Sequence, residues 1–379
     1  MMSDSHDTPP PRVRQLRIPA GMTRAQTVYL FVIALVAAGS VLRLTGSIFI
    51  PFAIAVLLSF VFSPIVSFLV KRHVPRFLAI TSVLLIFVAF GFLIALVIYS
   101  SFQSLLREFP TYQARFSTLL QELIERFDLP ADIASQLEIT RTIGSTLLSF
   151  SGNFMSFVSG FVVVMVFLLF LLLEKPYTRR KMTMAVRDET TRRLSRVLIH
   201  ITSQIGRYVA VKLFVSSLTA VVVYIAFSII GVDFPFVWSV LTFLFNFIPS
   251  IGSLAITFVS GVFALIQFLP DWNPIIAAFL SMSTAQFLIG NVIDPKMLGD
   301  RLNLSPVIIL LSLLLWGWLW GTAGLFLAVP LTVAVKIVFE NIPGLEAFGI
   351  LMGTGNFKPR RNTATAGTDS GAASSEETS

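Results

Sequence analysis

The chain has 379 residues, of which 55% are hydrophobic and 13% are charged, and its mean hydropathy is +0.84. Soluble domains carry about 25% charged residues, so this composition excludes an ordinary soluble fold and indicates a multi-spanning membrane protein. Cysteine is absent, which excludes disulfides and thiolate chemistry, and the three histidines lie far apart in sequence. We therefore expect no metal site.

The N-terminal third of the chain predicts a tail, three spans and an amphipathic segment. Residues 1–26 are polar and basic and predict a disordered cytoplasmic tail rather than a cleavable signal. Residues 27–102 predict the N-terminal transmembrane helices, at about 27–42, 46–70 and 77–101. Residues 103–151 predict an extracytoplasmic amphipathic helical segment, because apolar residues recur at three- and four-residue steps. This segment either packs on the membrane surface or bundle, or forms a gate or an oligomer contact.

The remaining chain contains the predicted transport core. Residues 152–206 predict a transmembrane helix and a basic cytoplasmic linker, and residues 207–343 predict the C-terminal transmembrane transport core. A span at about 208–231 opens this core, and Arg207 and Lys212 at its start are expected to snorkel. Residues 344–379 are expected to form a disordered cytoplasmic tail.

Two uncharged runs of the core, 234–269 and 302–335, are longer than single spans. Small residues interrupt them near the middle, at 249–252 and at 321–324, and neither interruption carries a charge. We expect two broken or re-entrant helical hairpins, with Gly321 and Gly324 as hinge or tip of the second, separated by a span at 274–293. The expected fold is an all-α, polytopic transmembrane helical bundle.

The span-and-hairpin pattern occurs twice in the core. Pro235 precedes Gly252 by 17 residues, and Pro306 precedes Gly324 by 18. The two units would start on opposite sides of the membrane, as in the inverted repeats of transporters. Because Pro and Gly are common in membrane helices, chance similarity is the alternative interpretation.

Charge predicts the orientation of the chain. If both termini are cytoplasmic, 23 of the 28 lysines and arginines lie on the cytoplasmic side. Five lie outside: Arg43, Arg107, Arg115, Arg126 and Arg141. The high net positive charge therefore reflects membrane topology, and we expect no nucleic-acid partner.

The densest polar cluster near a span is at 286–296. Gln286, Gly290 and Asp294 are four residues apart and would share one helical face, with Asn291 displaced by one position. Pro295 cannot donate a backbone hydrogen bond, so carbonyl groups one turn earlier are freed. This set suits a cation, a proton or a polar small molecule, although Asp294 could simply mark the end of the span.

The first hairpin supplies three further binding candidates: Asn246, Pro249 and Gly252. For Asn246 the alternative is a hydrogen bond between helices. No nucleotide-binding loop, catalytic triad or zinc motif is present in the sequence, so we expect no enzyme, no catalytic residue and no cofactor.

Several stretches resemble the autoinducer-2 exporter family, also called PerM-like permeases. They are N-F-I-P-S-I-G at 246–252, Q-F-L-I-G-N-V-I-D-P-K-M-L-G at 286–299, L-N-L-S-P at 302–306, G-W-L-W-G-T-A-G-L-F-L-A-V-P at 317–330 and I-P-F-A-I-A-V-L-L-S-F at 50–60. The resemblance covers about 27–343 and implies a bacterial inner-membrane transporter. Residues that match the family pattern are Asn246, Pro249, Gly252, Gln286, Asn291, Pro295 and Gly299, whereas Asp294 falls at a variable position.

Members of that family are associated with export of autoinducer-2 or with sodium or lithium/proton antiport. We expect a secondary transporter that exports a small polar solute by alternating access, coupled to a proton or sodium ion. The alternatives are a sodium or lithium/proton antiporter and a non-transporting membrane scaffold. The expected partners are the lipid bilayer, the solute and the ion, and a homo-oligomer is left open.

Overall fold

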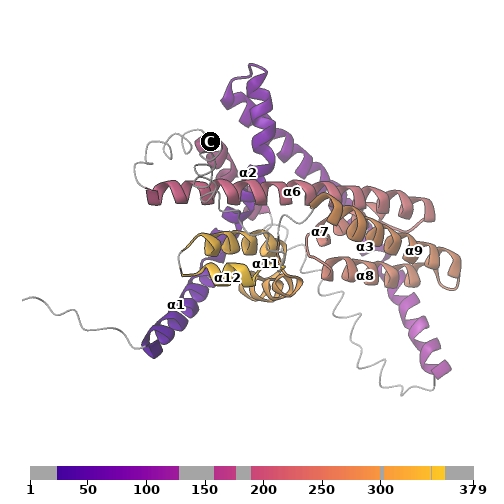
Figure 1. Cartoon of the computed structure of the whole chain (residues 1–379). Coiled ribbons are helices and arrows are strands. Elements are labelled where there is room, and N and C mark those ends of the chain that lie inside the picture. The colour runs from indigo at the N-terminus through magenta and orange to yellow at the C-terminus, as the bar shows by residue number, and fades with distance from the viewer. Residues whose placement is uncertain (1–23, 128–157, 176–188, 299–302, 343, 355–379) are drawn as a thin grey trace, which may run out of the picture. The chain divides into compact units, whose positions relative to one another are not determined.

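The computed structural model describes residues 24–127, 158–175, 189–298, 303–342 and 344–354 (Figure 1). The predicted tails therefore lie largely outside the described residues. Of the predicted basic linker, residues 176–188 lie outside them, whereas residues 189–206 belong to the helix Glu189–Ile230. Residues up to Ser47 form one contact unit, and residues from Ile48 form a second, described separately below. In the first unit, α1 (Arg24–Leu44) covers the first predicted span.

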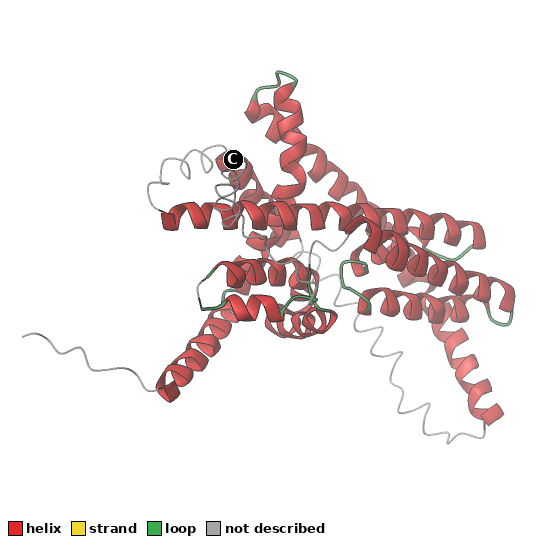
Figure 2. Cartoon of the chain, viewed as in Figure 1, coloured by secondary structure: helices red, strands yellow, loops and turns green. Residues whose placement is uncertain are grey.

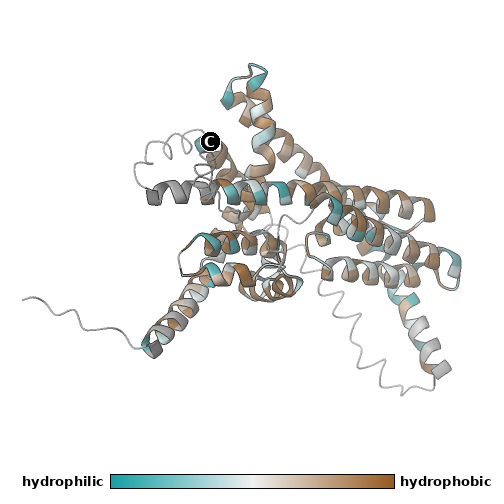
Figure 3. Cartoon of the chain, in the orientation of Figure 1, coloured by the Kyte–Doolittle hydropathy of each residue, from teal (hydrophilic) through white to brown (hydrophobic). Residues whose placement is uncertain are grey.

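Every regular element of the described residues is a helix (Figure 2), as the sequence predicts. Seven of these helices are long and apolar enough to cross a membrane. Brown, hydrophobic residues dominate them in Figure 3, and many of their large apolar side chains are exposed, as expected for helices that face lipid and not water. The predicted all-α polytopic bundle is confirmed.

Three helices pack around one apolar core in the N-terminal part of the second unit. They are α2 (Gly46–Lys71), α3 (Arg76–Phe127) and the helix Val158–Lys175. Ala55, Ile80 and Leu168, one from each helix, are completely buried in that core. Pro51 and Pro64 lie inside α2, which continues through both.

Helix α3 extends well beyond the predicted third span. It runs for 52 residues without a break, about 78 Å, and so includes the first part of the predicted amphipathic segment. The Tyr112 hydroxyl donates a hydrogen bond of 2.6 Å to Asp233, and Arg115 donates to the carbonyl oxygen of Gln267. This part of the segment packs on the bundle, whereas residues 128–151 lie outside the described residues.

The first hairpin consists of α7 (Pro235–Phe245) and α8 (Ile251–Phe268). Helix α7 has 11 residues, or about 16 Å, which is roughly half of the ~30 Å hydrocarbon core. This arm is too short to cross the membrane by itself. The hairpin lies beside α6 (Glu189–Ile230) and α9 (Trp272–Leu288), which share a core built around Phe227, Ile256 and Met282 (Figure 1).

The second hairpin lies within α11 (Pro306–Asn341), which turns back on itself at Gly321. Gly321 has φ 60° and ψ −138°, a conformation that is essentially restricted to glycine. The indole nitrogen of Trp316 donates to the Thr332 hydroxyl at 3.1 Å and joins the two arms. The tip therefore lies where the sequence predicts it.

The two hairpins share two structural features. Pro235 and Pro306 both stand in the first turn of their helices, where a missing N–H costs nothing. A Cβ added at Gly252 would lie 1.8 Å from the carbonyl oxygen of Phe245, and one added at Gly324 would lie 1.8 Å from that of Trp316. Each tip thus needs glycine because one arm crosses the other's backbone, and this likeness supports the predicted repeat.

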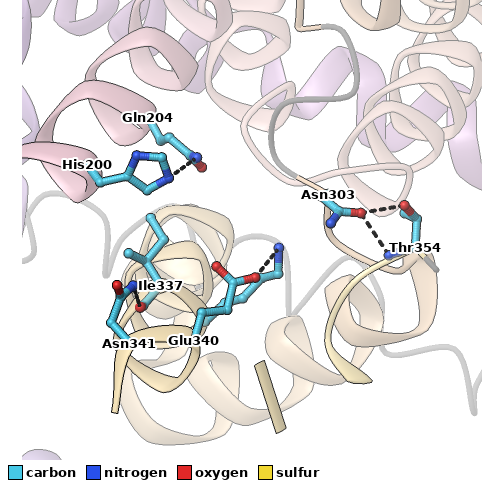
Figure 4. A network of polar contacts seen from close by, with 8 residues as sticks. His200, Gln204, Asn303, Ile337, Glu340, Asn341 and Thr354 are labelled. Carbon is cyan, nitrogen blue, oxygen red and sulfur yellow. Dashed lines mark hydrogen bonds and ion pairs between the residues drawn. The ribbon is translucent and has the colours of Figure 1, made fainter. Parts of the chain in front are cut away.

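A folded segment follows α11, within the range predicted to be disordered. Helix α12 (Glu346–Leu351) packs against α11, where Gly349 lies close to Glu340. The segment then returns to the start of the hairpin, where the side-chain oxygen of Asn303 accepts a hydrogen bond from the Thr354 N–H at 3.1 Å (Figure 4). The C-terminal end of the described chain is therefore tied to the base of the second hairpin.

Candidate functional site

The candidate site is an ion pair between two antiparallel helices. The ammonium group of Lys212, on α6, lies 2.8 Å from a carboxylate oxygen of Asp294, at the start of α10 (Asp294–Leu298). Their side chains are only 9% and 15% exposed. The second carboxylate oxygen, Oδ1, is buried and has no hydrogen-bond partner. The site thus holds one satisfied carboxylate oxygen and one buried oxygen without a partner.

The local backbone around Asp294 is unusual. Residues Ile289–Ile293 form a π-helical turn, η1, between α9 and α10, and the Asp294 N–H bonds to the carbonyl of Ile289, five residues earlier. Pro295 offers no N–H to the helix, so the preceding turn can widen at little cost. Single π-turns inside α-helices are frequent at functional sites.

The π-turn changes which residues face α6. In a regular helix, Gln286, Gly290 and Asp294 would share one face, as expected from the sequence. Instead Ile289 is buried against Val211 and Val215 of α6, and Gly290 is exposed. The prediction that Gly290 shares the polar face was therefore wrong, because the extra residue in the turn shifts the register.

Two more polar groups are buried without partners on the same two helices. Gln286, two turns before Asp294, is 8% exposed, and its Nε2 makes no hydrogen bond. Ser216, one turn after Lys212, is fully buried, and its Oγ makes none. A buried polar group without a partner costs about 1–3 kcal/mol, so these groups favour a bound polar molecule. We call Lys212, Ser216, Gln286 and Asp294 the polar seam.

Tyr208 lies one turn before Lys212 on α6 and is buried. The sequence interpretation that Lys212 snorkels was wrong, because its side chain is buried and paired. Lys212, Ser216 and Tyr208 were not among the predicted site residues. The signal that points to Lys212 is its position inside an otherwise uncharged span.

The other predicted residues are not part of the polar seam. Two lie next to it on the helix and the rest lie at the hairpin tips. Asn291 and Pro295 are exposed. Asn246 is buried at the C-terminal end of α7, Pro249 is half-buried, and Gly252 is buried at the tip. In the second hairpin Gly321 is exposed and Gly324 is buried.

The first hairpin's tip meets the second hairpin. Ile248 packs against Leu313 and Ala328 of α11, and the rings of Phe247 and Phe326 lie 6.5 Å apart. The two hairpins are therefore in apolar contact near their tips. Among the described residues, no group of three histidine, aspartate or glutamate side chains could hold a metal ion.

Comparison with known proteins identifies the family. The sequence profile of the AI-2E family transporter matches residues 29–344. A Borreliella burgdorferi protein named "Putative transport protein" is 35% identical over 325 residues, covering 86% of this chain and 90% of that protein. A Haemophilus influenzae protein of the same name is 33% identical over 82% of this chain and 91% of its own length. The AI-2 transport protein TqsA of Escherichia coli is 30% identical over 82% of this chain and 91% of its own length.

The match spans the transmembrane helices, both hairpins and the polar seam and ends before α12, so it concerns most of the folded chain rather than one segment. The family match agrees with the seven membrane-crossing helices of the described residues and with the family resemblance found in the sequence. The chain is a multi-pass membrane protein and belongs to the AI-2E family of transporters.

Proposed function

We propose that this protein is a secondary transporter that exports a small polar solute of the autoinducer-2 class by alternating access, coupled to a proton or a sodium ion. The observation that carries the proposal is the buried Lys212–Asp294 pair, together with the unpartnered groups of Gln286 on α9 and Ser216 on α6. An ionisable residue held inside a membrane bundle is costly, and such residues typically mark solute or ion pathways.

The seam favours a solute with several hydroxyl or carbonyl groups. The Gln286 amide donates, the Ser216 hydroxyl donates and accepts, and the free Asp294 oxygen accepts. A small polyhydroxylated molecule could satisfy all three while it remains neutral. The name of TqsA, an AI-2 transport protein, is consistent with this class of solute.

The ion pair supplies a reason for coupling. When Lys212 moves away, Asp294 becomes a buried charge without a partner, which is unfavourable unless a cation or a proton replaces the ammonium group. Each opening of the pair would therefore take up one cation, and each closing would release it. The same observation supports the second candidate, a sodium or lithium/proton antiporter, in which the exchange occurs without a solute.

The hairpins support alternating access. Helix α7 ends inside the bundle, and its tip meets α11 through Ile248 in an apolar contact that involves no ion pair among the described residues. Broken helices that meet near the middle of the membrane are characteristic of transporters in which one repeat moves against the other. The tips are the parts we expect to move.

The proposal is tested by export from cells that carry the wild type or single variants at matched membrane levels. The medium is assayed for autoinducer-2 and profiled for other small metabolites. We expect the wild type to export a solute that Gln286→Ala retains in the cell, while Thr284→Ala, an exposed position on the same helix, exports normally. Asn291→Ala tests separately whether that exposed amide contributes.

Wild-type profiles equal to those of the empty vector would overturn the solute exporter. In that case, inverted vesicles that change their internal pH on addition of sodium or lithium would establish the antiporter instead. That response should be lost in Asp294→Asn, because asparagine cannot exchange a proton for a cation.

A further inference from the structure

A second site of basic residues lies where α2, α3 and the helix Val158–Lys175 meet at their ends. Arg76, the first residue of α3, donates through Nη2 to the carbonyl oxygen of Leu172 at 3.0 Å. Lys175 donates through Nζ to the hydroxyl oxygen of Ser63, on α2. The two cations thus reach into the same three-helix packing from different elements.

Part of the Arg76 position has a structural explanation. The carbonyl of Leu172 would normally accept from the N–H of the residue four positions later, but that residue is Pro176, which has none. Arg76 replaces this donor and so caps the helix. The cap accounts for only one nitrogen of the guanidinium group, Nη2.

The rest of the arrangement is unexplained by the protein's own contacts. The Arg76 Nε is buried and makes no hydrogen bond. Lys175 lies close enough to Arg76 for their positive charges to repel each other, and neither forms an ion pair with a described carboxylate. Two neighbouring cations without a paired carboxylate favour a bound anion.

We propose that Arg76 and Lys175 bind the phosphate group of an anionic phospholipid. The site lies at the ends of membrane-crossing helices, the level at which headgroups occur. Phe77, Leu78 and Phe170 beside it are 64%, 55% and 63% exposed and offer an apolar surface to the acyl chains. Basic pockets between transmembrane helices bind such headgroups, and this proposal does not depend on the proposed function.

The bound lipid would join the start of α3 to the end of the helix Val158–Lys175. Its phosphate would lie between the two cations and reduce the repulsion between them. We therefore expect anionic lipid to stabilise the N-terminal three-helix packing, through contacts that a zwitterionic lipid or a free phosphate cannot fully reproduce. Glu174, next to Lys175 in sequence, would weaken this attraction without removing it.

The test measures thermal unfolding of the purified full-length protein in detergent with increasing phosphatidylglycerol, phosphatidylcholine or inorganic phosphate. Each variant is compared with its own lipid-free midpoint, so a loss of basal stability does not affect the result. Lys175→Met removes one cation, Arg76→Gln removes the other, and Lys71→Met removes an exposed charge nearby as a control.

We expect phosphatidylglycerol to raise the midpoint of the wild type and of Lys71→Met by more than phosphatidylcholine or inorganic phosphate does. The lipid concentration for half of this effect should rise about fivefold in Lys175→Met, as expected for one basic residue at an anionic surface. Equal stabilisation by phosphatidylcholine, or an equal loss in Lys71→Met, would overturn the site. Stabilisation by inorganic phosphate to the same extent would show that the ligand is a free anion and not a lipid.

Discussion

Replacing one member of the Lys212–Asp294 pair should be far more damaging than replacing both. The charged atoms lie 2.8 Å apart, which at an effective dielectric constant of about 20 gives an attraction of about 6 kcal/mol before the cost of desolvation. Because both side chains are nearly buried, a single substitution leaves an uncompensated charge, which typically costs about 3–5 kcal/mol. We expect this loss of unfolding free energy for Lys212→Met and for Asp294→Asn.

The double variant should recover most of the loss, because no buried charge remains in it. Buried ion pairs that are replaced by neutral groups of similar volume are often close to neutral in stability. We therefore expect Lys212→Met combined with Asp294→Asn to lie within about 2 kcal/mol of the wild type. Transport should nevertheless be lost, because the exchangeable carboxylate is absent.

The assay is a double-mutant cycle on reversible unfolding of the purified protein in mixed micelles. Lys71→Met serves as a control for removal of an exposed positive charge and should change stability by about 0.5 kcal/mol or less. If the two single losses simply add in the double variant, the charges are not coupled. That result would refute both the ion pair as a stabilising contact and the coupling argument built on it.

Three further predictions follow from contacts of single residues. Gln286→Leu should abolish export while leaving the protein at least as stable, because it removes a buried amide that lacks a partner; an unfolding midpoint below that of the wild type would contradict this. Gly252→Ala should prevent normal accumulation in the membrane, because the added Cβ would overlap the carbonyl oxygen of Phe245. Gly290→Ala is the control and should accumulate normally, because its added Cβ would meet no atom within 4 Å outside its neighbouring residues and its own helix backbone; both levels are measured by immunoblot. Tyr112→Phe should lower unfolding free energy by about 1.5–3 kcal/mol by removing the hydrogen bond to a carboxylate, and equal losses in Tyr99→Phe would argue against that contact.

The helices and both hairpin tips could be predicted from the sequence because membrane helices are governed by local rules. Uncharged length sets the number of spans, and small residues without charge mark the places where an arm turns back. Gly324 illustrates the reason: only glycine allows one arm to cross the backbone at Trp316. The corresponding clash at Gly252 shows that the first hairpin tip also requires glycine.

The length of α3 was not predictable in the same way. The change from an apolar run to an amphipathic pattern near residue 102 suggested that the span ended there. Both patterns are helical, however, and Pro110 removes only one backbone hydrogen bond from a helix that continues through it. Hydropathy reports where the membrane ends and does not by itself report where a helix ends.

The helical face of the 286–294 cluster was mispredicted for a different reason. A period of 3.6 residues assumes a regular helix, and Pro295 had already indicated that the hydrogen bonding before it would be altered. The widened turn at Ile289–Ile293 turns Gly290 outward, while Gln286 and Asp294 remain partly or fully buried. A proline next to a polar cluster should therefore reduce the weight given to simple periodicity.

The pairing of Lys212 with Asp294 required one further step of topology. Helix α6 crosses the membrane, the first hairpin returns to the side that α6 reached, and α9 crosses back, so the start of α6 and the end of α9 share one side whatever the orientation. Lys212 lies 18 residues before the end of α6, and Asp294 lies 22 residues after the start of α9, so the two lie at a similar depth although 82 residues separate them. Two opposite charges at the same depth of an apolar bundle are strongly favoured to meet, since each alone would be unpaired. Depth along neighbouring antiparallel helices, and not spacing along one helix, is the property that identifies this site.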